Sequence, residues 1–155
     1  MDLILAFLFV LFVLLVGLIP FFMLYLFSDG IAFLMHRVFG YRLEVISENL
    51  KKSSLSTDES ELKHLIRKVY RNLTDVLIEG IKAFTMTTRS VQKRHKIRNP
   101  EILEPYFKKG QSVMGVLGHF NNWEWGSLSA GKQLKHNIVA LYLPLNNKWI
   151  DRFVR

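Results

Sequence analysis

An uncharged apolar run at the N-terminal end constrains the fold of this chain more than any other feature. No charged side chain occurs between Leu3 and Phe27. About 20 apolar residues suffice for a helix to cross the hydrocarbon core of a bilayer, and this run is longer, so a tilted spanning helix fits it. Pro20 predicts either a kink in that helix or its end, followed by a second apolar segment through Phe39 that crosses the membrane or lies in its interface.

The alternative interpretation of this run is a cleaved signal peptide. A signal peptide needs a basic start, a shorter apolar core and a small-residue cleavage site, whereas this chain begins Met1-Asp2 and has no Ala-x-Ala after the run. All 21 Lys and Arg residues follow His36. The positive-inside rule therefore predicts a single-pass anchor in residues 1–36 and a cytoplasmic domain in residues 37–155.

Charge and cysteine content narrow the classes of partner. The chain has a formal net charge of +8 at pH 7 and contains no cysteine. Basic side chains beside a membrane are attracted to anionic headgroups, by ~1 kcal/mol each. Nucleic acid is the other polyanion such a chain could bind, but the predicted anchor argues against it. The lack of cysteine excludes disulfides, a cysteine nucleophile and thiolate metal sites.

Periodic apolar residues predict a mainly helical region after the anchor. Ser56 and Glu59 fit a capping box at the start of the longest helix, in which apolar residues recur with the 3.6-residue period through Phe84. Its apolar face packs in a core or lies against the bilayer. The basic run Thr87–Arg98 is either solvated or holds phosphate groups. Helices are predicted over residues 41–52, 101–108 and 124–134, over the periodic segment that follows the capping box and runs to Phe84, and from Trp149 onward.

Two short apolar runs indicate strands. Ser112–Leu117 and Asn137–Leu143 are bounded by turn residues and flank the predicted helix 124–134. Strand, helix and strand in this order are typical of a parallel βαβ unit. The predicted fold class is therefore α/β, with a transmembrane helix, several helices and part of a mixed or parallel sheet.

Between these runs, the segment Gly118-His-Phe-Asn-Asn-Trp-Glu124 carries the candidate chemistry. Residues five apart on one helix point ~140° from each other, so His119 and Glu124 meet if His119 ends the strand and Glu124 lies in the first helical turn. Such a pair suits general-base catalysis. The alternative is a loop histidine with a structural role. The other histidines lack metal-ligand spacing, so no metal site is predicted.

Four blocks of the chain resemble the lipid A late acyltransferases of the lysophospholipid acyltransferase-like superfamily. They are the apolar anchor with Pro20, the block Gly40-Tyr41-Arg42 to Glu48-Asn49-Leu50, the helix from Tyr70-Arg71-Asn72-Leu73 to Glu79, and His119-Phe-Asn-Asn-Trp-Glu124. The sequence differs from the usual pattern of this family at two positions. The family often has Gly at the position of Asn121, and a basic residue at the position of Leu143.

The resemblance implies an inner-membrane enzyme without cofactor or metal. Its donor would be a fatty acyl thioester on acyl carrier protein, and its acceptor a hydroxyl of a lipid A precursor. His119 and Glu124 would be catalytic, with Asn121, Asn122 and Trp123 shaping the substrate site. Alternatives are a glycerophospholipid or aminolipid acyltransferase with the same dyad, and an inactive anchored fragment or binding module. The resemblance also implies a truncated domain, with residues 1–155 inactive on their own.

Overall fold

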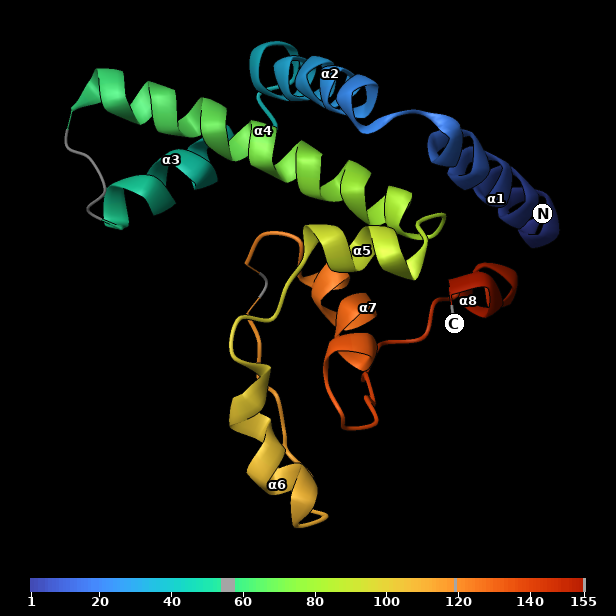
Figure 1. The fold of residues 1–155 in the computed structure, drawn as a ribbon. Coiled ribbons are helices and arrows are strands. Elements are labelled where there is room, and N and C mark those ends of the chain that lie inside the picture. Colours follow the sequence, from blue (N-terminus) through green and yellow to red (C-terminus); the bar gives the residue numbers. More distant parts are fainter. Residues whose placement is uncertain (54–57, 119, 155) are drawn as a thin grey trace. The chain divides into compact units, whose positions relative to one another are not determined.

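The computed structural model describes residues 1–53, 58–118 and 120–154 (Figure 1). Throughout these residues the regular structure is helical and no strand occurs. The predicted α/β fold class is therefore wrong. The elements are α1 (Asp2–Leu18), α2 (Phe21–Phe33), the π-helix η1 (Leu34–Val38), α3 (Leu43–Lys52), α4 (Glu59–Ala83), α5 (Thr88–Arg94), the 3₁₀-helix η2 (Pro100–Leu103), α6 (Glu104–Lys108), α7 (Trp123–Gln133) and α8 (Lys148–Val154).

The two segments predicted as strands have no regular secondary structure. They lie within residues 111–118 and 137–145, where the side chains of Val116 and Leu141 are 86% and 97% exposed. A parallel strand exists through hydrogen bonds to a neighbouring strand, and neither segment forms such a ladder. An apolar run bounded by turn residues does not reveal whether a pairing partner is present, which is why the sequence prediction failed here.

Pro20 divides the N-terminal apolar run into two helices. Helix α1 ends at Leu18, Pro20 is extended with φ −61° and ψ 149°, and α2 begins at Phe21. Proline has no backbone N–H and favours the start of a helix over its interior. Of the two alternatives predicted for Pro20, the structure confirms the second, in which the first helix ends and another apolar segment follows.

The second apolar segment has the length and composition that a helix needs to cross a membrane. Helix α2 continues into η1, and residues Phe21–Val38 form an 18-residue window with a mean hydropathy of 1.3, of which 17% is buried within the protein. Helix α1, with 17 residues, is shorter. The chain thus has one N-terminal helix, among the described residues, that is long and apolar enough to cross a membrane.

The chain divides into two compact units. One comprises Met1–Leu18 and Gly80–Arg155, and the other comprises Ile19–Glu79. Helix α4 contributes residues to both units, because the division falls between Glu79 and Gly80. The predicted boundary between an anchor and a catalytic domain at residue 36 concerns function, and it stays a prediction.

In the second unit, polar side chains of α2 face α4, and the two helices lie side by side (Figure 1). Ser28 Oγ donates a hydrogen bond of 2.9 Å to Thr74 Oγ1, and both residues are buried. Asp29 accepts two hydrogen bonds from the Arg71 guanidinium, at 2.7 and 3.0 Å. The acidic residue within the candidate span is therefore paired through both of its carboxylate oxygens.

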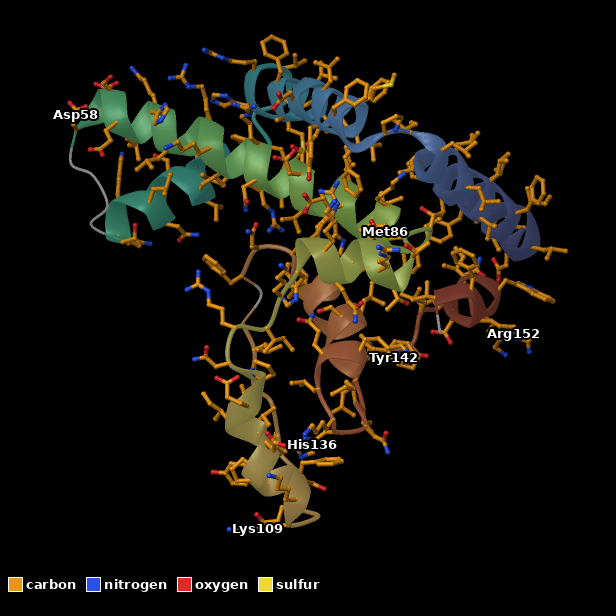
Figure 2. The ribbon with its side chains drawn as sticks, in the orientation of Figure 1. Asp58, Met86, Lys109, His136, Tyr142 and Arg152 are labelled. Atoms are coloured by element: carbon orange, nitrogen blue, oxygen red, sulfur yellow. The ribbon has the colours of Figure 1, made fainter. Side chains whose placement is uncertain are left out.

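Helix α4 packs its periodic apolar face in a core. Of the two predicted alternatives, a core-facing helix and a helix lying against the bilayer, the structure confirms the first. Asp58 precedes the helix (Figure 2), and its carboxylate accepts a hydrogen bond of 2.8 Å from the Glu61 N–H, which caps the first turn. The predicted cap, Ser56, lies outside the described residues. The core of this unit consists of Ala32, Leu62, Ile66 and Tyr70, with Met35, Ile46 and Leu50 packed against it.

In the first unit, aromatic side chains connect three segments that are distant in sequence. Phe9 of α1 makes edge-on contacts with Phe84, which follows α4, and with Phe153 of α8, with ring centroids 6.4 and 6.1 Å apart. Helix α5 packs against α7, and Figure 1 shows the two crossing closely. Through α5 and the C-terminal end of α4, this unit positions the N-terminus of α7, where the candidate site begins.

Candidate active site

The loop before α7 turns sharply at Asn121. Its φ of 55° is in the left-handed region, which asparagine tolerates better than most residues. The Asn121 carbonyl accepts a hydrogen bond of 3.1 Å from the Trp123 N–H. The side chain of Asn122 then caps α7, because its Oδ1 accepts a hydrogen bond of 3.2 Å from the Trp125 N–H. These two asparagines set the direction in which α7 leaves the loop.

Glu124 lies in the first turn of α7, as the sequence predicted. Its side chain is exposed, and its carboxylate lies against Gly80 of α4, where a β-carbon built on the glycine would be 2.6 Å from Glu124 Oε2. A carboxylate in the first turn also interacts favourably with the helix dipole.

His119, the predicted general base, lies outside the described residues. The structure brings Asn121, Asn122, Trp123 and Glu124 together at the N-terminus of α7. Of these, Asn122 has a role in the fold itself as the cap. The assignment of the others to substrate binding or catalysis, and the pairing of His119 with Glu124, stay predictions.

Helix α7 is attached to the segment after α5 by a set of partly buried polar contacts. His95 Nδ1 lies 2.8 Å from Oγ of the fully buried Ser129. Gln133 binds the same segment twice, because its Oε1 accepts from the Ile97 N–H at 2.9 Å and its Nε2 donates to the His95 carbonyl at 3.0 Å. Side-chain bonds to two backbone groups satisfy polar atoms that helix packing alone would leave unpaired. They hold the helix that carries Glu124 against α5.

The two tryptophans at the start of α7 have different surroundings. Trp123 is partly exposed, whereas Trp125 is buried, and the guanidinium of Arg94 lies 5.9 Å from the centroid of its ring. A cation over an indole face is attracted by the ring quadrupole. Trp125 thus belongs to the contact between α5 and α7, whereas the predicted substrate-site role of Trp123 stays a prediction.

A second polar cluster lies around α6, away from Glu124. Lys135 Nζ donates to Glu104 Oε1 at 2.6 Å, and this hydrogen bond, with the charge of Lys108, lowers the pKa of the Glu104 carboxyl. His136, labelled in Figure 2, lies edge-on to the Phe107 ring. A hollow of about 430 Å³ opens beside α6, and Glu124 does not line it. Among the described residues no three His, Asp or Glu side chains form a metal-binding group.

Two features of the site were missed by sequence reasoning. The contact of Gly80 with Glu124 had one available signal, namely a glycine inside a strongly periodic helix, which usually has a packing reason. The attachment of α7 by Ser129 and Gln133 had none, because polar residues on a helix give no indication of which distant segment they will bind.

Comparison with known protein families identifies the family of this chain. The family model of the bacterial lipid A biosynthesis acyltransferases matches residues 2–155. The chain therefore belongs to the bacterial lipid A biosynthesis acyltransferase family, and the activity of that family is acyl transfer. Neither the curated proteins nor the solved structures contain a match to this chain.

Proposed function

We propose that the enzyme moves a fatty acyl chain from acyl carrier protein to a hydroxyl of a lipid A precursor, with His119 and Glu124 as the catalytic pair. The family match supports acyl transfer to a lipid. The position of Glu124 in the first turn of α7, five residues after His119 in the sequence, is the observation that carries the assignment of the pair. No metal or other cofactor is required by this chemistry.

The reaction proceeds in two proton-transfer steps. The neutral imidazole of His119 takes the proton of the acceptor hydroxyl while that oxygen attacks the thioester carbonyl carbon. The tetrahedral intermediate then collapses, breaking the C–S bond, and the departing thiolate takes the proton from the imidazolium. The products are an ester on the acceptor and a free thiol on the carrier. Glu124 orients the imidazole and stabilises its charged form.

Exposed basic residues near the site support an acidic donor protein. Arg89, Lys93 and Lys96, on α5 and just after it, are exposed, and α5 packs directly against α7. Acyl carrier protein is acidic as a family, so a basic surface beside the active site would raise the rate of encounter between the two proteins. The enzyme works at the bacterial inner membrane, where its apolar N-terminal segment anchors it and its catalytic part is cytoplasmic.

An acceptor comparison tests the proposal. The purified enzyme is given acyl carrier protein charged with a labelled acyl chain, together with a lipid A precursor, a glycerophospholipid or an aminolipid. Transfer to the lipid A precursor above the other acceptors is expected. Preferred labelling of the glycerophospholipid or the aminolipid would contradict lipid A precursors as the acceptor class and would indicate that lipid as the acceptor. Absence of transfer to every lipid would favour a binding module without activity.

A further inference from the structure

Helix α4 contains a glycine at an unfavourable position. Gly80 lies three residues before the end of this 25-residue helix, and it is buried. Glycine inside a helix costs about 1 kcal/mol relative to alanine, because its backbone loses more freedom on folding. A glycine inside a helix usually has a packing reason, which here is the group that occupies the space of the missing side chain.

That group is the carboxylate of Glu124. A β-carbon on Gly80 would lie 2.6 Å from Oε2, 3.5 Å from Cδ and 3.9 Å from Oε1 of Glu124, and these are its three nearest neighbours. The first distance is shorter than any van der Waals contact of carbon with oxygen. The observed position of the carboxylate and a side chain at residue 80 thus exclude each other.

We propose that Gly80 is a positioning residue for the catalytic carboxylate, a role that rests on the proposed pairing of Glu124 with His119. The backbone of Glu124 is held by the capped start of α7, but its side chain is exposed and has several rotamers. The surface of α4 at Gly80 is the place against which the carboxylate lies. A fixed carboxylate fixes the imidazole it binds, and misplacing a catalytic group by ~1 Å costs up to ~100-fold in rate.

The contact also predicts where the effect of a substitution will be seen. The atom that a methyl group would meet is the far end of an exposed, flexible side chain. In the Gly80→Ala variant, the carboxylate of Glu124 can rotate away while the backbones of α4 and α7 stay in place. Alanine also favours the helix by about 1 kcal/mol. The variant should keep or gain thermal stability and lose turnover.

The test compares Gly80→Ala with Gly131→Ala in the complete enzyme. Gly131 is also helical, but a β-carbon there would meet Ile138 Cγ1 at 3.8 Å, an ordinary contact. We expect Gly80→Ala to lower kcat by about 10- to 100-fold with little change in the KM for donor. Gly131→Ala should keep the parental kcat, and both should melt at or above the parental temperature.

A double-mutant cycle separates this inference from the proposed function. In a Glu124→Ala background, Gly80→Ala should cause no further loss, because the carboxylate it displaces is gone. A further loss there, a parental kcat for Gly80→Ala alone, or a lowered melting temperature would each overturn the role of Gly80. Parental activity of Glu124→Ala itself would instead contradict the catalytic pair.

Discussion

At the scale of single residues, Asn121 is the position of the candidate site where backbone conformation limits substitution most. Its φ of 55° costs most L-residues about 1–2 kcal/mol, costs asparagine less and costs glycine nothing. We expect Asn121→Gly to leave thermal stability close to parental and Asn121→Val to lower it by about 1–2 kcal/mol, as followed by thermal unfolding. Equal melting of the valine variant and the parent would show that this turn is not maintained in solution.

Sequence reasoning about the site succeeded for residues whose roles are local. The first-turn position of Glu124 followed from the loop predicted up to Trp123 and the helix predicted over residues 124–134. The contact of Glu124 with Gly80 could not be predicted, because 44 positions separate the two residues and their meeting depends on how α4 and α7 pack. The same holds for Gln133 and the segment after α5. His119 lies outside the described residues, so its predicted contact stays a prediction.

At the scale of helices, Lys82 connects α4 to the end of α1. Its side chain is buried, and its Nζ donates hydrogen bonds to the carbonyls of Val16, at 3.2 Å, and Gly17. These carbonyls lie in the last turn of α1, where helix-internal partners are lacking. A cation at this end is also favoured by the helix dipole.

The ionisation of Lys82 should appear in the pH dependence of stability. Burial lowers its pKa from the ordinary value of 10.5, so the unfolded chain binds this proton more tightly than the folded one. The free energy of unfolding should therefore rise as pH increases from the lowered pKa towards 10.5. We expect the melting temperature of the parent to rise relative to that of Lys82→Met across this window. A constant difference would contradict a charged, desolvated Lys82.

Several helices were predictable from the sequence, whereas the predicted sheet was wrong and α5 was interpreted only as part of a basic run. Helices were predicted over residues 41–52, 101–108 and 124–134 and over the periodic segment from the capping box to Phe84, and α3, α6, α7 and α4 lie there. The apolar period and the capping residues of a helix lie within one continuous segment, so they can be found in the sequence of that segment alone. A strand needs a partner elsewhere in the chain, and Ser112–Leu117 and Asn137–Leu143 have none in the described structure.

At the scale of the whole molecule, the orientation in the membrane can be tested directly. The apolar segment that ends at Val38 is followed by Arg42, Lys51 and Lys52, and basic residues flanking a span favour the cytoplasmic side. A reporter fused after Lys52 should be active as a cytoplasmic protein. Activity of a periplasmic reporter at the same position would reverse the proposed topology.

The central claim is that acyl transfer depends on the imidazole of His119, as oriented by Glu124. It is tested most directly by the turnover of His119→Ala in the complete enzyme, with acyl carrier protein as the labelled donor and a lipid A precursor as acceptor. Removal of a general base lowers turnover by ~10²–10⁴-fold, so nearly all transfer should be lost, with a smaller but large loss in Glu124→Ala. Turnover of His119→Ala at the parental rate would contradict the account.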